Sequence, residues 1–373
     1  MQRRAVSLLL VAPLLALIAG GSAQAARSGS TTSTVRPATT ADDDQYRVNN
    51  LVSDVPGMAT NTDPNLVNAW GLVAGPSTPW WVADNGTDVS TIYGRHGEIM
   101  PLVVQVAGAP TGIVFNGNSD FVISDGTNSG PAVFIFDTED GTVRGWNPSV
   151  PPPPPSTQSF IAVDRSDVGA IYKGLAIAST PGGDMLYATD FHNARVDMFD
   201  GDFTLVSTGS TFVDPGIPAG YGPFGIQAIG DTIFVTYAKQ DADAEDEVAG
   251  EHLGYVDAFA TDGTFQARVA SLHQLNAPWG LAMAPADFGK FSGDLLVGNF
   301  GDGVIHAFRL NSDGTGQPVG ALRKVSGRIL RVDGLWALEF GNGDAAGRTN
   351  QLFFTAGPDD EAHGLFGRIV SHA

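Results

Sequence analysis

Hydrophobic residues in this chain are grouped in short segments that alternate with turns rich in Gly, Pro, Asp and Asn, which is the pattern of β-strands joined by tight connections. One arrangement recurs, in which a turn that contains a glycine leads into an apolar strand. It occurs six times, at residues 70–73, 111–114, 173–176, 224–227, 279–282 and 333–336. The mean spacing of the six glycines is about 53 residues. This spacing suits a repeated unit of roughly 40–50 residues.

Each copy of the repeat continues with further apolar segments. A second segment, ending in a small or polar residue, lies at 81–84, 121–125, 186–190, 233–237, 295–299 and 352–356, and a third is clearest at 133–137, 196–200 and 304–308. Three strands and a connecting fourth make a unit of the size of a propeller blade. The sequence therefore predicts an all-β protein, a six-bladed β-propeller. A two-domain β-sandwich is the alternative, although it gives no reason for six similar glycine turns.

Closure of the ring is predicted from the two ends of the repeat region. The sixth unit supplies strands at 335–340, 351–355 and 365–370 but no outer strand, while a spare strand-like segment at 46–52 precedes the first unit. Pairing of that segment with the sixth blade would remove exposed sheet edges. We therefore expect one propeller over residues 46–373, closed by its N-terminal strand, with surface loops at 151–155 and 240–251.

The N-terminal residues have the pattern of a secretory signal peptide. Arg3 and Arg4 precede an apolar run at 8–18 and a small-x-small ending at 23–25. We expect cleavage after Ala25, a disordered linker over 26–45 and a secreted, extracellular protein. A membrane anchor is the alternative, but the apolar run is shorter than the roughly 20 residues that span a bilayer, so no transmembrane segment is expected after cleavage.

Composition narrows the classes of partner. The chain has 20 Lys and Arg against 40 Asp and Glu, a formal charge of −20, without a visible basic patch. It is therefore not expected to bind nucleic acid. It has no Cys, which excludes disulfides, thiolate nucleophiles and Cys-ligated metals. We expect a soluble monomer whose partners are neutral or cationic.

Several stretches carry a resemblance to a known family. The most distinctive are 63–68 (DPNLVN), 188–193 (ATDFHN), 238–243 (AKQDAD), 298–303 (GNFGDG), 333–338 (DGLWAL) and 364–367 (GLFG). Over residues 50–369 the chain resembles a family of secreted bacterial proteins, six-bladed β-propellers of the NHL-like kind whose biochemical role is uncharacterised. The resemblance implies the same fold and secretion, and it implies no catalytic residue. The chain departs from the family at Ala69, where Pro is expected before Trp-Gly.

One mouth of the central channel is the predicted ligand site. The first strand of a blade begins, and the second ends, at the same mouth, where loops held by a rigid scaffold converge. The residue before each glycine is expected to point to the axis, which gives a predicted ligand-binding set: Trp70, Thr111, Lys173, Phe224, Trp279 and Asp333. The aromatic members could stack on a ligand or plug the channel as core, and both interpretations stay open. Lys173 and Asp333 belong to opposite units, so we expect an ion pair across the axis.

A metal ion at the same mouth is a second hypothesis. Six-bladed lactonases of the gluconolactonase kind are expected to hold a divalent ion at the axis through carboxylate and Asn oxygens. Here only Asp333 of the six axial candidates offers a carboxylate, and a hard cation such as Ca²⁺ needs six to eight oxygens. Further oxygens could come from Asn68, Asp84, Asp125, Asp190 and Asn299.

The acidic run at 241–247 is a separate calcium candidate. It places Asp241, Asp243 and Glu245 at alternating positions. Asp246 and His252 stand where the EF-hand pattern requires Gly and Glu, so a solvated acidic loop is the alternative.

These observations favour a secreted binding module that presents its channel mouth to a small molecule or a cell-envelope partner. Two alternatives stay open. One is a metal-dependent extracellular hydrolase or lyase, lactonase-like, that uses carboxylates at the mouth. The other is a structural surface or matrix protein whose propeller displays loops.

Overall fold

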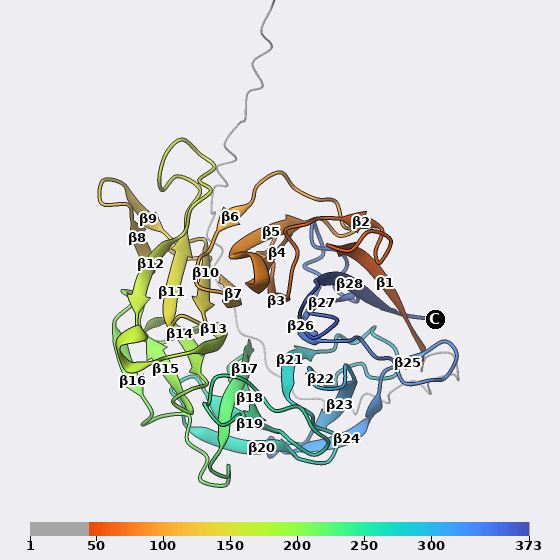
Figure 1. Ribbon diagram of the computed structural model, residues 1–373. Helices are drawn as coiled ribbons and strands as arrows, with labels where there is room; N and C mark the ends of the chain where they lie inside the picture. Colours follow the sequence, from red (N-terminus) through yellow and green to blue (C-terminus); the bar gives the residue numbers. More distant parts are fainter. Residues whose placement is uncertain (1–44, 373) are drawn as a thin grey trace, which may run out of the picture. The chain divides into compact units, whose positions relative to one another are not determined.

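The computed structural model describes residues 45–372 as an all-β structure. The predicted signal peptide (1–25) and nearly all of the predicted linker (26–45) lie outside the described residues. Six sheets, in which the four main strands are antiparallel, stand around a central axis as the blades of a propeller (Figure 1). The fold class predicted from the repeats is therefore confirmed.

Blades 1 to 5 are each built from strands that follow one another along the chain, and the first strand of each blade is innermost. Blade 1 consists of β3 (Ala69–Val73), β4 (Trp80–Asp84), β5 (Val89–Tyr93) and β6 (Val104–Gln105), and blade 2 of β7 (Pro110–Phe115), β10 (Phe134–Thr138), β11 (Thr142–Trp146) and β12 (Phe160–Asp164). Blade 3 consists of β13 (Tyr172–Thr180), β14 (Gly183–Asp190), β15 (Arg195–Phe199) and β16 (Leu205–Thr208), and blade 4 of β17 (Tyr221–Ile229), β18 (Thr232–Lys239), β19 (Tyr255–Ala260) and β20 (Phe265–Ser271). Blade 5 consists of β21 (Pro278–Met283), β22 (Leu295–Asn299), β23 (Ile305–Leu310) and β24 (Gly316–Ala321).

Blade 6 joins the two ends of the described chain. Its strands, from the axis outward, are β26 (Leu335–Phe340), β27 (Leu352–Ala356), β28 (Leu365–Ser371) and β1 (Gln45–Ser53), with the short strands β2 (Asn61–Thr62) and β25 (Arg323–Lys324) paired to β1. Strand β1 runs antiparallel to β28, so that Asn49 lies opposite Arg368. The prediction that the N-terminal strand closes the last blade is confirmed.

The prediction for the second strand of blade 2 is wrong. The segment 121–125 contains β8 (Val122–Ser124), which pairs only with β9 (Ser129–Pro131) in a separate hairpin, and β10 takes the second place in the blade. The two segments differ in burial, since Val122 and Ser124 are exposed whereas every residue of β10 is buried. A strand inside a blade is covered on both sides by neighbouring blades, which requires a fully buried segment.

Apolar side chains fill the spaces between blades. Successive side chains of a strand point to opposite faces, so each sheet packs on the blade before it and the blade after it. The six main hydrophobic clusters accordingly lie one at each blade interface, as with Val235 of blade 4 against Tyr187 of blade 3.

The repeated glycines mark where neighbouring blades meet at the axis. A Cβ atom on Gly71 would lie 2.5 Å from the backbone oxygen of Thr111 in the next blade, and one on Gly280 would lie 2.5 Å from that of Trp336. A side chain at these positions would clash with the neighbouring backbone.

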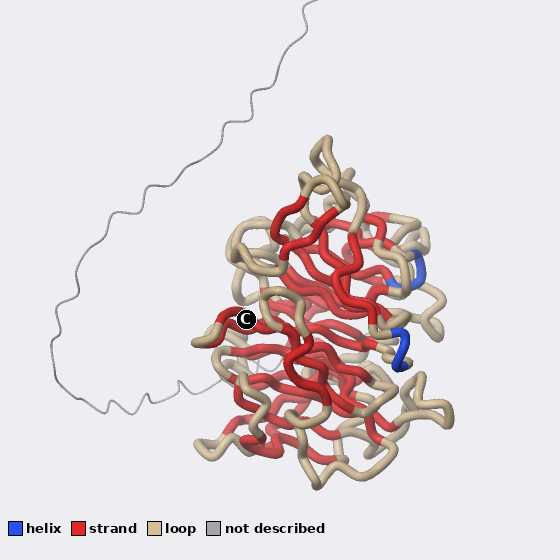
Figure 2. Tube along the Cα trace, turned by 90° about the vertical axis from the view of Figure 1, so that its left-hand side faces the viewer, coloured by secondary structure: helices blue, strands red, loops and turns tan. Residues whose placement is uncertain are grey.

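The inner strands all run in the same direction along the axis, so the channel has two different mouths. We call the mouth where they begin, near Trp70 and Lys173, the start mouth, and the mouth where they end, near Phe115 and Glu339, the end mouth. Both short 3-10 turns, η2 (Asn85–Thr87) and η3 (Ser166–Val168), lie on the face of the start mouth (Figure 2). Within residues 45–372, no helix has the length and apolar character to cross a bilayer.

Candidate functional site

The start mouth is closed by a cluster of aromatic side chains. Trp70 stacks on Trp336 with ring centroids 3.6 Å apart, and Phe224 and Trp279 meet the Trp70 ring edge-on at 6.2 and 6.1 Å. Phe300 stacks on the other side of Trp336 at 4.1 Å. Trp70, Phe224 and Trp336 are 2% exposed or less. Of the two interpretations left open by the sequence, this geometry is that of a plug.

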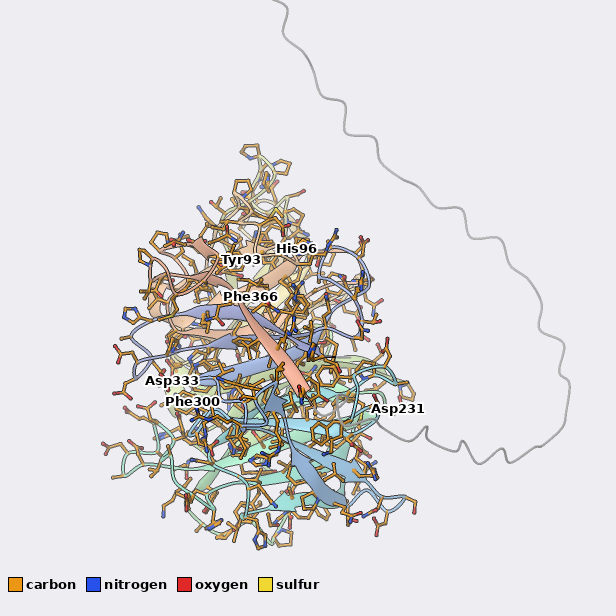
Figure 3. All side chains as sticks on the ribbon, turned by 90° about the vertical axis from the view of Figure 1, so that its right-hand side faces the viewer. Tyr93, His96, Asp231, Phe300, Asp333 and Phe366 are labelled. Atoms are coloured by element: carbon orange, nitrogen blue, oxygen red, sulfur yellow. The ribbon has the colours of Figure 1, made fainter. Side chains whose placement is uncertain are left out.

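The prediction that Asp333 points to the axis in blade 6 is wrong, since Trp336, three positions later, takes that place. Asp333 is exposed, and it accepts a hydrogen bond from the backbone of Asp359 at 3.1 Å. It lies on the rim of the same face as Phe300, opposite Asp231 in the turn between β17 and β18 (Figure 3). In blade 6 the residue equivalent to Trp70 is Trp336, whose backbone lies against Gly280 of blade 5. Sequence comparison missed it because blade 6 has Ala337 where the other blades have the repeated glycine.

Lys173 occupies the axis as predicted but has different partners. It is 1% exposed, and its Nζ pairs with Glu139 and, at 3.0 Å, with Asp246, so the expected ion pair with Asp333 is wrong. Its Nζ also lies 5.2 Å from the centre of the Trp70 ring. Burial acts to lower the pKa of Lys173, but the charges of Glu139 and Asp246 outweigh it and raise the pKa above its ordinary value.

The polar groups around Lys173 are connected to one another. Asn68 donates to Glu361 at 2.6 Å and accepts from the indole of Trp336 at 3.0 Å, and Asn85 donates to Glu139 at 2.9 Å. Burial raises the pKa of Glu247 to about 8, with the charge of Lys173 opposing the shift. The start mouth thus holds a connected polar network around Lys173, although the buried indole nitrogen of Trp70 has no hydrogen-bond partner among the described residues.

Thr111, the remaining member of the predicted set, also serves the fold. Its hydroxyl is buried, donates to Asp137 at 2.9 Å and lies at the same distance from the backbone oxygen of Tyr172 in blade 3. Asp137 is the last residue but one of β10, and Thr138 ends the strand in the place that the sequence assigned to Asp125. Burial raises the pKa of Asp137 to about 7.

The predicted metal ligands are not brought together. Asp243 and Glu245 are exposed, and Asp241 accepts a hydrogen bond from the backbone of Glu245 at 3.0 Å. Between residues 45 and 372, no group of three or more His, Cys, Asp or Glu side chains could hold a metal ion. The loop 240–251 instead reaches over the start mouth, where Asp246 pairs with Lys173.

The possible oxygen donors at the ends of the second strands are used locally. Asp84 accepts from the backbone of Thr91 at 2.9 Å through Oδ2, and Asp190 pairs with Arg195 at 3.0 Å. Asn299 donates through its amide nitrogen to Asp302 at 3.1 Å, while Asp84 Oδ1 and Asn299 Oδ1 are buried without a hydrogen-bond partner among the described residues.

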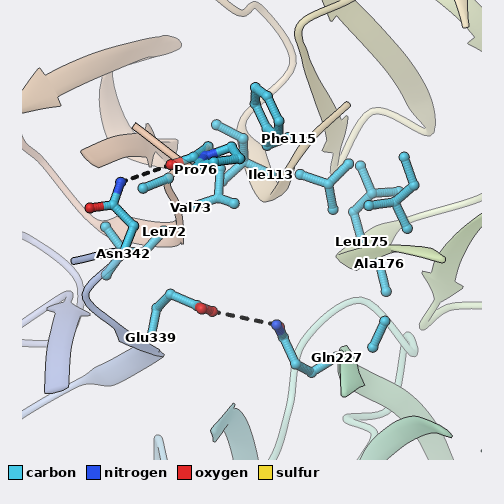
Figure 4. A pocket seen from close by; sticks show the side chains of 15 residues that line it. Leu72, Val73, Pro76, Ile113, Phe115, Leu175, Ala176, Gln227, Glu339 and Asn342 are labelled. Atoms are coloured by element: carbon cyan, nitrogen blue, oxygen red, sulfur yellow. Dashed lines mark hydrogen bonds between the residues drawn. The ribbon is translucent and has the colours of Figure 1, made fainter. Parts of the chain in front are cut away.

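The end mouth contains an open cavity, which we call the cup. It has a volume of about 380 Å³ and is lined by the ends of the inner strands of blades 1, 2, 3, 4 and 6 (Figure 4). Most of the side chains that line it are apolar, Val73, Ile113, Phe115, Leu175 and Ile177 among them, and polar atoms also face the cavity.

Three polar side chains line the cup. Asn342 is engaged with the loop after β3, since it donates to the backbone oxygens of Gly75 and Thr78 at 2.8 and 2.9 Å. Glu339 and Gln227 face each other across the cavity, with the amide nitrogen 3.4 Å from the nearer carboxylate oxygen (Figure 4). Burial alone raises the pKa of Glu339 to about 8. The cup therefore presents one carboxyl group and one amide in apolar surroundings.

Neither Glu339 nor Gln227 is among the site residues predicted from the sequence. The aligned strands place both at the same position of the repeat, where blades 1, 2, 3 and 5 have Val73, Val114, Ala176 and Ala282. A polar residue in two blades at a position that is apolar in the other four could have pointed to this site. In blade 6 the position is found only when Ala337 is aligned with the repeated glycine.

The sequence and the fold of this chain can be compared with those of known proteins. No protein-family profile matches the chain. Two uncharacterised proteins of Acanthamoeba polyphaga mimivirus are 35% and 34% identical to it, over alignments that cover 87% of this chain and 80% and 86% of theirs. The chain belongs to the same family as these viral proteins. The bacterial membership and the secretion implied by the resemblance stay predictions for this family member.

Solved structures support the fold alone. A streptogramin B lyase superposes with a TM-score of 0.51 at 10% identity, covering 88% of this chain and 99% of the lyase. A protein of unknown function from Bacteroides thetaiotaomicron gives a TM-score of 0.54 at 10% identity, covering 87% of this chain and 76% of that one.

Proposed function

We propose that this protein is an exported binding protein whose cup holds a small, mainly apolar molecule. The observation that carries the proposal is the cup itself, a cavity of about 380 Å³ lined mainly by apolar side chains, with a facing acid and amide. Ligand sites for small molecules have this size and this composition, in which a few polar groups set the orientation of the ligand. Perturbed ionisable groups in such cavities also mark functional sites.

The start mouth supports the proposal by contrast. Its aromatic residues and Lys173 are buried against one another, so a ligand there would have to displace existing contacts. The cup needs no such rearrangement, because its volume is already present.

A fluorescent probe tests binding in the cup. N-phenyl-1-naphthylamine is small, apolar and uncharged near neutral pH, and its emission rises when it leaves water. We expect saturable binding to the purified protein. Ala228→Phe, which places a ring in the cup wall, should weaken binding at least tenfold.

The matched control adds the same ring elsewhere. Val206, on the outer strand β16, is 49% exposed, so Val206→Phe should bind the probe like the wild type. Circular dichroism would verify that both variants are folded. Absence of binding to the wild type, or equal binding to Ala228→Phe, would reject the cup as the site.

Export is the second part of the proposal and rests on the N-terminal pattern, with its basic start, apolar run and Ala23-Gln24-Ala25 ending. Expression of the full chain in a bacterium should yield a protein outside the cytoplasm whose N-terminus, by Edman or mass analysis, is Ala26. The same chain without residues 2–25 should stay in the cytoplasm. Retention of the full chain in the cytoplasm would contradict export and leave the binding proposal intact.

A further inference from the structure

Glu339 is half-buried in apolar surroundings, with neither a cation beside it nor a short hydrogen bond. The fully buried Asp84 and Asp137 also lack a cation, but they accept hydrogen bonds from Thr91 and Thr111, both at 2.9 Å, and other buried acids are paired with arginine. Asp197 pairs with Arg195 at 3.0 Å, Asp257 with Arg268, and Asp294 with Arg309 at 3.1 Å. Buried carboxylates usually need such a partner, because an uncompensated charge in apolar surroundings is costly. Among residues 45–372, the carboxyl group of Glu339 meets one hydrogen-bond partner, the amide of Gln227, at 3.4 Å.

The surroundings of Glu339 offer no hidden counter-ion. The cup is lined by residues of β3, β7, β13, β17 and β26 and of the adjoining loops, and Glu339 is the one ionisable side chain among these lining residues. Its side chain is partly exposed and faces the cavity (Figure 4). The acid is therefore available to a group that enters the cup.

We infer that the cup selects a hydrophobic ammonium ion, an alkyl or aryl amine or quaternary ammonium, over an uncharged molecule of the same shape, with the Glu339 carboxylate as its counter-ion. This inference rests on the proposed function and adds the chemical class of the ligand. The apolar side chains of the wall accept the hydrocarbon part of the ligand, and they include one aromatic ring, that of Phe115. The formal charge of −20 also favours the approach of cations over anions.

Protonation of Glu339 makes the inference testable through pH. Because burial raises the pKa of Glu339 to about 8, a cation that binds at pH 7 must first displace a proton. The apparent affinity for a cation should therefore rise with pH and level off above about pH 8, and at pH 7 it should be roughly tenfold below that plateau. An uncharged ligand that accepts a hydrogen bond from the protonated acid would show the opposite trend.

Two probes of nearly equal shape separate these cases. Benzyltrimethylammonium carries a quaternary nitrogen that does not titrate, and neopentylbenzene has a carbon in its place. Each would be used to displace N-phenyl-1-naphthylamine from the purified protein between pH 6 and pH 9. We expect the cation to bind at least tenfold more tightly than the hydrocarbon at pH 9, with a smaller ratio at pH 6.

Substitutions assign the effect to the acid. Glu339→Gln should abolish both the preference for the cation and its pH dependence, while the affinity for neopentylbenzene stays within about twofold. The matched control is Glu251→Gln in the exposed loop 240–251, which should behave like the wild type.

Each outcome decides one claim. Equal binding of the two probes, a preference for the hydrocarbon, or a preference for the cation that survives in Glu339→Gln would overturn the ammonium inference and leave the cup as a binding site. Failure of both probes and of the dye would overturn the proposed function as well.

Discussion

The two mouths of the channel both place ionisable side chains in apolar surroundings, yet they treat them differently. At the start mouth, Lys173 is 1% exposed and is paired with Glu139 and Asp246. At the end mouth, Glu339 faces a cavity with one long hydrogen bond from Gln227.

This difference separates a structural role from a binding role. A buried charge that is fully paired contributes to the fold, since removing one partner leaves the other uncompensated. An acid in apolar surroundings with neither a cation nor a short hydrogen bond costs stability, and groups of this kind are concentrated at functional sites. Lys173 attracted attention in the sequence, but Glu339 is the group that remains free to meet a ligand.

The largest expected effect lies in the aromatic plug. Trp336→Ala removes a buried indole that stacks on Trp70 and Phe300, and large-to-small changes of this kind cost about 4 kcal/mol of the free energy of unfolding. Phe115→Ala in the partly exposed cup wall should cost about half as much. Urea unfolding followed by circular dichroism measures both, and equal losses would remove the distinction between a packed mouth and an open one.

The ion pairs of Lys173 come next. Lys173→Met leaves Glu139 and Asp246 without their cation, but both carboxylates are partly exposed and can be hydrated, so the free energy of unfolding should fall by about 1 kcal/mol. The same substitution at the exposed Lys239 should change it by no more than about 0.5 kcal/mol. Affinity of the cup for N-phenyl-1-naphthylamine should be unchanged in both variants, and a loss of binding in Lys173→Met would mean that the start mouth takes part in the site.

Glu339 should give the stability a dependence on pH. Its pKa is raised from 4.5 in the unfolded chain to about 8 in the folded protein. Between these values the folded state keeps a proton that the unfolded state has lost, so the contribution of Glu339 to stability falls as the pH rises.

Glu339→Gln removes this titration, which makes it the matched comparison. The stability of the wild type relative to the variant should fall by about 1 kcal/mol per pH unit from pH 5 to pH 8 and be constant above that range. Urea unfolding at several pH values measures the difference, and a difference that does not vary with pH would show that Glu339 is solvated.

The smallest effect is expected for calcium. Because Asp241, Asp243 and Glu245 do not converge, neither EDTA nor millimolar calcium should move the melting temperature by more than about 1 °C. A rise that grows with calcium concentration would indicate that loop 240–251 binds the ion.

Much of the architecture was predictable because it depends on local periodicity. The number of blades follows from the recurring apolar strands and the glycine turns, five of which are equivalent, and the spare segment before the first blade specifies the closure by β1. Each of these features arises within a single repeat or from the requirement that sheet edges be paired.

The errors arose where one repeat departs from the others. In blade 2 the inserted hairpin β8–β9 carries an apolar segment that resembles the second strand, and in blade 6 Ala337 replaces the repeated glycine. The register shift in blade 6 placed Asp333 at the axis instead of Trp336, and it concealed the equivalence of Glu339 with Gln227.

The sequence by itself determined the all-β class, the six blades and the strand that closes them, because these follow from alternation and repetition along the chain. Only the tertiary structure decided which mouth is filled and which is open. That depends on how side chains from different blades meet at the axis: Trp70 and Trp336 are 266 residues apart and stack, and Gln227 and Glu339, 112 residues apart, face each other across a cavity. Such meetings depend on the volume and register of residues in separate blades, which local patterns do not encode.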